Sequence, residues 1–357
     1  MAIEFGIFDH IEVHGGRSAE EIYEQRIAFL KRAEEGGFHA FHLAEHHGHQ
    51  LSCSPTAAVF LAALARETTR LKLIPTVVCL PLHHPVRVFE DLAMVDALSH
   101  GRLELGVGKG ITPFEHLQFG HPPEEASERS RDILRMLLAA WETGVISSEG
   151  SPFYEFLELK LPFAPVQRPY PPLWTAGNVE TAGRGGHNFI FPMRIPEQMR
   201  ARYDELRAAS RKEPGHQNPH VTEPRIAQAQ GVVVARTDAE AKDIARRRWT
   251  NYMNTVARSH GLIPPHLQGD EVPELDNPLA RDMMARDPFE DELVVAGTVE
   301  RIRDYYVEQA RRGIANYFIV MLPFGDMTDE EATTTLEAFI SDVIPAVREA
   351  ESLRAAA

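Results

Sequence analysis

Histidine residues gather at two places where a short apolar run of the chain ends. One cluster is Glu45-His-His-Gly-His49 and the other is His83-His84. Histidine exchanges protons near neutral pH, so either cluster could serve acid–base chemistry. The three histidines of the first cluster could also be metal ligands, but no cysteine and no second carboxylate-bearing loop completes a set. The sequence therefore favours proton transfer and predicts no metal site.

Glycine residues follow two later apolar runs, as Gly106-Val-Gly-Lys-Gly110 and as Gly177-Asn-Val-Glu-Thr181. Glycine lets a backbone approach a phosphate closely, and the beginning of a helix offers unpaired N–H donors. Loops rich in histidine and loops rich in glycine together suit a phosphorylated, planar redox cofactor.

Short β-branched runs alternate with amphipathic stretches, which is typical of βα units around a parallel sheet. The sequence predicts strands at residues 3–8, 40–44, 71–78, 102–107, 173–176, 188–191, 226–235 and 317–322. The chemistry-bearing segments follow these strands, so in a (β/α)₈ TIM barrel they would meet at the carboxyl end. A doubly wound sheet is the alternative; it is disfavoured because no strand precedes a G-x-G-x-x-G fingerprint.

The chain is expected to form one domain over residues 1–357, because single barrels routinely exceed the usual domain length. Residues 251–296 are rich in Pro, Asp and His and show weak periodicity. They are expected to be an insertion that covers the pocket as a lid.

Composition narrows the class of protein. Hydrophobic residues make up 43% and charged residues 25%, and the net charge of −15 argues against nucleic acid or an anionic membrane as partner. No apolar run approaches the about 18 residues of a membrane span. Two cysteines and an N-terminus without a basic leader region lead us to expect a cytoplasmic protein.

Several motifs follow one another in a fixed order: Phe5-Gly-Ile-Phe-Asp-His10, Ala44-Glu-His-His47, Leu80-Pro-Leu-His-His-Pro-Val86, Leu98-Ser-His-Gly-Arg102 with Leu105-Gly-Val-Gly-Lys-Gly110, and Pro171-Pro-Leu-Trp-Thr-Ala-Gly177. Together they resemble the bacterial-luciferase-like family of flavin-dependent monooxygenases. The resemblance covers residues 3–344 and is strongest over residues 3–191. It implies a TIM barrel with a flavin at its mouth.

The resemblance also assigns roles near the flavin ring. His46 matches the family position with general acid–base duty, and Glu45 is expected to shape the polar network beside it. Thr76 and Val77 match the place where family members carry a non-proline cis peptide bond beneath the ring.

For the cofactor phosphate, the resemblance places Lys109 where the family more usually has arginine. Gly177 and Asn178 would offer backbone N–H groups, and Thr181 a hydroxyl. Gly108 stands where bacterial luciferase has a reactive cysteine, which argues against light emission from a long-chain aldehyde.

The leading hypothesis is a two-component monooxygenase. It would bind reduced FMN as a cosubstrate, react with O₂ and oxygenate a small organic substrate. The reduced FMN would come from a separate flavin reductase, since no nicotinamide-binding domain is recognised in the sequence. Phe8, His10, Phe114 and Phe324 are expected to line the substrate pocket.

Two other functions stay open at this point. One is hydride transfer with the deazaflavin F420, which some related families use. The other is a non-catalytic flavin-binding protein, because a barrel can retain the cofactor site without turnover. A homodimer is expected in each case, through the alanine-rich segment 55–68.

Overall fold

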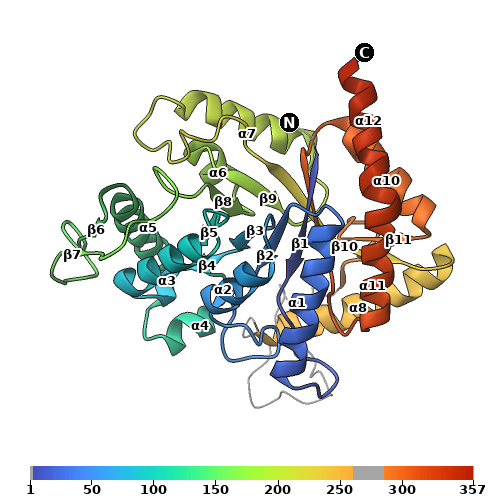
Figure 1. Ribbon diagram of the computed structural model, residues 1–357, viewed down its shortest axis with the longest axis horizontal. Helices are drawn as coiled ribbons and strands as arrows, with labels where there is room; N and C mark the ends of the chain where they lie inside the picture. Colours follow the sequence, from blue (N-terminus) through green and yellow to red (C-terminus); the bar gives the residue numbers. More distant parts are fainter. Residues whose placement is uncertain (1–2, 260–284, 357) are drawn as a thin grey trace.

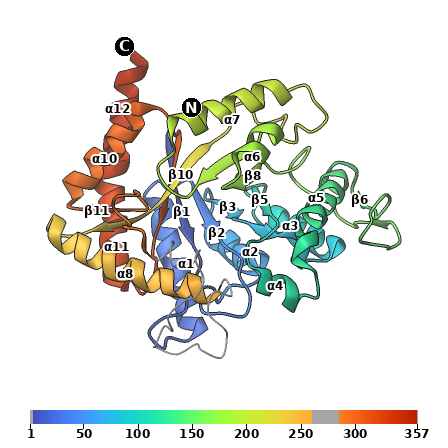
Figure 2. The ribbon, with the colours of Figure 1, turned by 180° about the vertical axis from the view of Figure 1, so that it is seen from behind.

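The computed structural model describes residues 3–259 and 285–356, which form a mostly parallel sheet closed nearly into a barrel and surrounded by helices (Figures 1 and 2). The barrel strands are β1 (Glu4–Asp9), β2 (Ala40–Leu43), β3 (Lys72–Pro75), β4 (Val78–Cys79), β5 (Leu105–Gly108), β8 (Leu173–Ala176), β9 (Asn188–Phe191), β10 (Ile226–Val234) and β12 (Tyr317–Met321). Their order is β3-β2-β1-β12-β10-β9-β8-β5-β4. The predicted TIM-barrel fold is confirmed.

The barrel closes between its third and fourth predicted strands. Leu73 of β3 forms a parallel bridge with Leu103, and β4 pairs with β5 through Val78 and Val107. The predicted strand 71–78 is thus split into β3 and β4, with residues 76 and 77 between them. Residues 76 and 77 are the two that were expected to form a cis peptide bond beneath the flavin ring, so the strand is interrupted at the expected cofactor site.

Helices cover the outside of the sheet. They are α1 (Ala19–Glu35), α2 (Ala57–Glu67), α3 (Pro85–Leu98), α4 (Pro113–Gln118), α5 (Ala126–Thr143), α6 (Val179–Gly185), α7 (Glu197–Ser210), α8 (Asp238–Ser259), α10 (Val299–Arg312), α11 (Asp329–Ala338) and α12 (Ile344–Ala356). Local sequence signals set several helix starts: capping boxes begin α1 at Ser18 and α11 at Thr328, and Pro85 occupies the first turn of α3.

The structure differs from the sequence expectation within residues 251–296. Residues up to Ser259 continue α8, and β11 (Val294–Gly297) pairs in parallel with β10, from Gly231↔Val294 onward. A long helix therefore occupies the first residues of the expected insertion, and a short sheet strand occupies the last ones. Its middle, residues 260–284, lies outside the described residues. A small hairpin, β6 (Val145–Ile146) with β7 (Leu159–Lys160), was also not predicted.

Alternating side chains of the strands form two packing layers. Trp174, Tyr317 and Ile319 belong to a cluster inside the barrel, whereas Phe318 and Val320 of the same β12 strand pack under the helices. This two-residue period is the ordinary geometry of a strand. The interior is thereby filled, and chemistry is confined to the loops at its ends.

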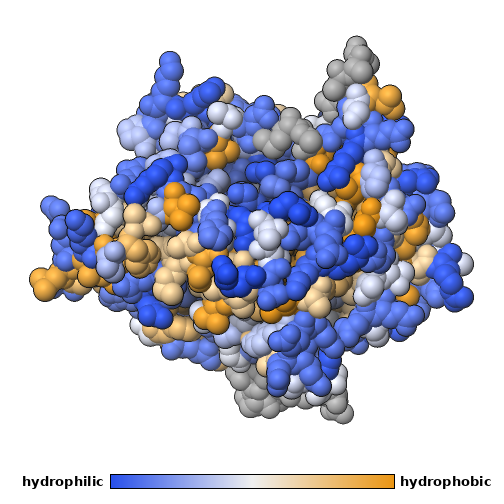
Figure 3. Space-filling view, in the orientation of Figure 1, coloured by the Kyte–Doolittle hydropathy of each residue, from blue (hydrophilic) through white to orange (hydrophobic). Residues whose placement is uncertain are grey.

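One face of the surface is notably apolar. Figure 3 shows hydrophobic side chains over the region that α2 and α3 occupy in Figure 1, and Val59, Met94 and Leu98 are exposed there. Among the helices of the described residues, none combines the length and apolar character that a membrane-spanning helix requires.

Candidate active site at the mouth of the barrel

Loops after neighbouring strands bring the predicted histidines together at the carboxyl end of the barrel. His46 and His49 lie in the loop after β2, and His83 follows β4 and a turn of 3₁₀ helix. Helix α4, after β5, contributes Glu115, a residue that was not predicted. Parallel strands end at one edge, which explains how segments almost 70 residues apart meet.

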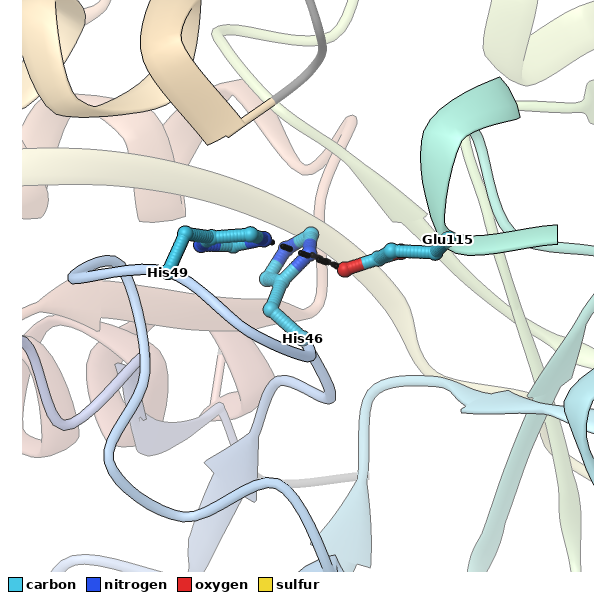
Figure 4. A group of neighbouring side chains, drawn as sticks. All are labelled: His46, His49 and Glu115. Carbon is cyan, nitrogen blue, oxygen red and sulfur yellow. Dashed lines mark hydrogen bonds and ion pairs between the residues drawn. The ribbon is translucent and has the colours of Figure 1, made fainter. Parts of the chain in front are cut away.

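The Glu115 carboxylate is the centre of the first cluster (Figure 4). Its Oε1 lies 3.1 Å from His46 Nδ1 and 3.1 Å from His49 Nε2. The backbone N–H of His47 donates to the same oxygen at 2.9 Å. The Glu115 side chain is only 2% exposed, so these hydrogen bonds replace its contact with water.

Glu45 is the centre of a second cluster beside the first. Its Oε1 lies 2.9 Å from His47 Nε2 and 2.7 Å from His83 Nε2, and its Oε2 accepts the N–H of Cys79 at 3.1 Å. His47 therefore touches both carboxylates, one with its ring and the other with its backbone. These contacts place Glu45 within the polar network beside His46.

Both carboxylates remain ionised in these surroundings. Burial raises the pKa of Glu115, but hydrogen bonds from His46 and His49 outweigh it and hold the pKa well below its usual range. The pKa of Glu45 is likewise lowered against burial, by hydrogen bonds from His47 and His83. Burial lowers the pKa of His83, yet the bond to Glu45 leaves it raised. The site thus pairs fixed negative charge with imidazoles that can gain protons.

Aromatic rings adjoin the imidazole cluster. The His10 ring stacks on His46 at a centroid distance of 5.5 Å and 24° between planes, and Phe8 meets His10 edge-on at 4.8 Å. Tyr252 of α8 lies 5.6 Å from His10 and 6.5 Å from Phe324. Three of the four predicted pocket residues are therefore joined through a tyrosine that was not predicted.

The fourth predicted pocket residue is less closely tied to the others. Phe114 is half-buried on α4, next to Glu115, and the described residues show no ring contact between Phe114 and the other three. Tyr252 was overlooked because it falls within the stretch expected to be an insertion, although Trp249, 5.3 Å away, is on the same helix.

The predicted cis peptide bond between Thr76 and Val77 is present. The Thr76 N–H donates to the carbonyl of Leu43, at the end of β2, over 2.6 Å. On the facing strand, a Cβ atom at Gly106 would collide with the Pro75 carbonyl oxygen, and one at Gly108 would lie 2.7 Å from Val77 Cγ2. Glycine is therefore required on β5 for close approach of the two backbones.

The predicted phosphate-binding residues lie on adjacent loops. Strands β5 and β8 pair in parallel, through Leu105↔Leu173, so the loops that follow them share one edge of the barrel. Lys109 is exposed on the first loop. Gly177, on the second, has a φ of +74° and open space where a side chain would begin.

The backbone amides of Gly177 and Asn178, the expected phosphate donors, have acceptors within the chain. The Gly177 N–H donates to Ile190 at 2.8 Å and the Asn178 N–H to Ala176 at 3.0 Å, so both are occupied within the chain. The Asn178 side chain caps α6 by accepting the Thr181 N–H at 2.9 Å. Because the first turn of a helix has no intrahelical acceptors for its N–H groups, Val179 and Glu180 supply the remaining donors there.

The structure also revises the sequence argument about metal ligands. Glu115 supplies the carboxylate loop that was thought to be lacking, and ligand atoms of His46, His49 and Glu115 lie within 4.8 Å of one another. The sequence signal that could have indicated Glu115 is Thr112-Pro113, which is typical of a helix start and puts Glu115 in the first turn of α4. In the structure, hydrogen bonds satisfy this carboxylate.

Solved structures that share the fold include monooxygenases and F420-dependent enzymes. Monooxygenase RslO1 from Streptomyces bottropensis is 23% identical, with a TM-score of 0.78 over 96% of this chain and 99% of that chain. The oxygenating constituent of Pseudomonas putida 3,6-diketocamphane monooxygenase, in complex with FMN, is 18% identical, with a TM-score of 0.72 over 97% and 99%. An F420-dependent secondary alcohol dehydrogenase is 17% identical, with a TM-score of 0.68 over 97% and 99%.

Two relatives found by sequence have a higher identity to this chain than the solved structures above. The uncharacterized protein y4wF of Sinorhizobium fredii is 31% identical over 97% of both chains. The oxygenase component of a flavin-dependent trigonelline monooxygenase from Acinetobacter baylyi is 29% identical over 49% of each chain. The profile of the luciferase-like monooxygenases matches residues 3–316, most of the length. The chain therefore belongs to the luciferase-like monooxygenase family.

Proposed function

We propose that this protein is the oxygenase component of a two-component monooxygenase, which uses reduced FMN and O₂ to oxygenate a small organic substrate. The observation that carries the proposal is the imidazole–carboxylate pair of His46 and Glu115 at the barrel mouth. The Acinetobacter relative, itself an oxygenase component, and the FMN complex of the Pseudomonas protein support the same chemistry. The electrons would come from a separate flavin reductase.

The residues at the mouth fit a planar ring beside the cis peptide bond. Gly106 and Gly108 carry no side chains, which lets β5 pack against residues 75–77 and form a thin wall there. Thr76 and Val77 would lie against the ring. At the neighbouring loops, the Lys109 ammonium, the Val179 and Glu180 amides and the Thr181 hydroxyl would hold the phosphate.

Reduced FMN, when bound, supplies the two electrons that activate O₂. The chain's own residues would supply binding, orientation and proton exchange. His46, with Glu115 on one edge and His10 stacked on its face, would hold or release a proton beside the ring. Phe8, Phe324 and Tyr252 would form the apolar side of the substrate pocket.

A second candidate is hydride transfer with F420, because the alcohol dehydrogenase that shares the fold uses that cofactor. Anaerobic titration of the purified protein with reduced FMN, oxidised FMN and F420, followed by fluorescence, separates the two. We expect reduced FMN to bind most tightly. Tight binding of F420 without binding of reduced FMN would favour the second candidate.

Admission of O₂ to the complex with reduced FMN tests catalysis itself. We expect the rate at which O₂ oxidises the bound flavin to differ between the wild type and His46→Ala, because proton exchange accompanies that oxidation. Identical oxidation traces for the two proteins would indicate a non-catalytic flavin-binding protein.

We further infer that two copies of the chain associate through α2 and α3. Val59, Met94 and Leu98 are large apolar side chains exposed on these helices, and small alanine residues surround Val59. Sedimentation of the wild type and of Val59→Glu with Met94→Glu tests this: a dimer that the double variant converts to a monomer is expected.

A further inference from the structure

Glu115 has a role that the proposed function does not by itself require. We propose that Glu115 is a positioning residue, whose carboxylate holds His46 in the tautomer with its hydrogen on Nδ1 and leaves Nε2 to exchange the proton. This inference rests on the proposed function, because that function gives His46 its acid–base duty. Glu115 would act through His46 without contacting the substrate.

The first support is the chemistry of the contact. An ionised carboxylate only accepts hydrogen bonds, so a nitrogen 3.1 Å from Glu115 Oε1 must carry a hydrogen. A bare Nδ1 at that distance would place its lone pair against those of a buried anion. The neutral His46 ring then has its lone pair on Nε2, which is the atom that can take up a proton.

The second support is that the carboxylate is held in place independently of His46. The backbone N–H of His47 and the Nε2 of His49 contact the same Oε1, at 2.9 and 3.1 Å. The other ring nitrogen of His49, Nδ1, is buried without a hydrogen-bond partner among the described residues. A bare Nδ1 suits that position, since an N–H there would lose its bond to water. His49 therefore also donates through Nε2, and Glu115 is a fixed acceptor.

The third support is that contacts of two different kinds with described residues restrain the His46 ring. His10 stacks on its face, which limits tilting of the ring plane. Glu115 bonds its edge and so selects which nitrogen points toward the carboxylate. Glu45 does neither, since its hydrogen bonds go to His47, His83 and the Cys79 amide. Glu45 is therefore a matched control for Glu115, because it is equally buried but pairs with other imidazoles.

Imidazole nitrogen NMR of the ¹⁵N-labelled protein, without cofactor, tests the tautomer directly. Long-range ¹H–¹⁵N spectra, assigned with His46→Gln, should show a hydrogen on His46 Nδ1 and none on Nε2 in the neutral ring. Glu115→Gln should abolish that single form, because an amide can both donate and accept. Glu115→Asp, which keeps the charge, should retain it at least in part. Glu45→Gln should alter the His47 and His83 signals and leave His46 unchanged.

Kinetics provide the second readout. Oxidation of bound reduced FMN by O₂ should slow by at least about 10-fold in Glu115→Gln, as expected when an orienting carboxylate no longer sets a tautomer. The dissociation constant for reduced FMN should stay within twofold. Glu124→Gln, an exposed carboxylate just beyond α4, is the matched control and should change neither. Thermal unfolding of each variant confirms that the folded protein is being compared.

The outcomes separate this proposal from the proposed function. An unchanged His46 tautomer in Glu115→Gln overturns the positioning role whatever the activity. The positioning role is also overturned if His46 Nδ1 carries no hydrogen in the wild type, as would be the case if that nitrogen bound a metal. A lost tautomer with unchanged oxidation rates in both Glu115→Gln and His46→Ala supports the positioning role and refutes the acid–base duty of His46.

Discussion

The two ends of the barrel both bury carboxylates but pair them with different cations. At the amino end of the strands, Arg225 lies 2.7 Å from Glu4 and 4.0 Å from Glu104. At the carboxyl end, Glu45 and Glu115 are paired with imidazoles. A guanidinium stays charged at any ordinary pH, whereas an imidazole titrates near neutrality. The Arg225 guanidinium at the amino end can therefore only stabilise the fold, although His39 also pairs with Glu4 there at 3.0 Å. The imidazoles paired with both carboxylates at the carboxyl end can also transfer protons.

The surroundings of the amino-end network agree with a structural role. Glu104 accepts the Trp174 indole N–H at 2.6 Å, and the Arg225 guanidinium lies 5.9 Å from the Tyr317 ring. These contacts tie the network to side chains that fill the barrel. Substitutions at the two ends should accordingly separate stability from activity.

The largest effect is expected from Arg225→Met. It leaves Glu4 and Glu104 without their common cation, which should lower the free energy of unfolding by about 3 kcal/mol, the lower end of the range for broken buried ion pairs. Urea unfolding measures this. Arg236→Met, at a 90% exposed side chain with an i,i+4 partner, is the control and should leave the midpoint unchanged. Equal effects of both substitutions would contradict the structural role.

His46→Ala should affect activity and spare the fold. Oxygenation or flavin oxidation should slow by about 100-fold, the usual contribution of a positioned acid–base group. Reduced FMN should still bind within a few-fold of the wild type. His39→Ala, which removes the imidazole paired with Glu4 at the other end, should instead lower stability and spare turnover. If His39→Ala slowed turnover and His46→Ala lowered stability, the roles assigned to the two ends of the barrel would be reversed.

Lys109→Ala should weaken binding of reduced FMN by about 10-fold, as expected from loss of one charge-assisted hydrogen bond. Binding of reduced riboflavin, which lacks the phosphate, should not change. Calorimetry or fluorescence titration with both flavins makes the measurement, with Lys242→Ala, an exposed lysine on α8, as control. A parallel loss for both flavins would place the phosphate elsewhere.

Glu4 at the amino end and His83 at the carboxyl end should contribute to stability with opposite dependence on pH. At the amino end, burial raises the pKa of Glu4, but His39 and Arg225 outweigh it and lower the pKa from 4.5 to about 2. That stabilisation is present above pH 4.5 and is lost as the pH falls toward 2. At the carboxyl end, the pKa of His83 is raised above 6.5, so its stabilisation is present below pH 6.5 and is lost as the pH rises.

Unfolding free energies measured across this pH range test both signs. Arg225→Met should flatten the acid limb, because it removes a cation that lowers the pKa of Glu4. His83→Gln should flatten the neutral-to-alkaline limb. If each substitution altered the other limb, the assignment of charges to the two ends would be incorrect.

Chelation should have the smallest effect. Hydrogen bonds already satisfy Glu115, so dialysis against EDTA should leave FMN binding and oxidation rates unchanged. Loss of activity that Zn²⁺ restores would show instead that His46, His49 and Glu115 hold a metal.

Much of the architecture could be predicted because the strands and long helices repeat a clear apolar pattern. All eight predicted strands are present, and the capping boxes at Ser18 and Thr328 begin α1 and α11. Strand β11 was not predicted because it lies largely within the stretch 251–296 that was expected to be an insertion, and the six-residue α4 is too short to show helical periodicity.

The candidate site was predictable only in part, for a related reason. His46 and Glu45 stand within a recognisable motif. Glu115 lies 69 residues beyond His46, and only the pairing of the strands brings the two together. The sequence did not indicate that the Gly177 and Asn178 amides have acceptors within the chain, because the Ile190 carbonyl lies on a neighbouring strand and the Ala176 carbonyl is reached through a turn.

Gly108 limits which side chains β5 could carry at the position that the sequence resemblance matches to the reactive cysteine of bacterial luciferase. A Cβ atom there would lie 2.7 Å from Val77 Cγ2, and valine has few side-chain conformations with which to withdraw. Glycine-to-cysteine replacement alone would therefore disturb the turn around residue 77. A cysteine at position 108 would therefore need a smaller residue at position 77, so the side chains that the two positions can carry depend on each other.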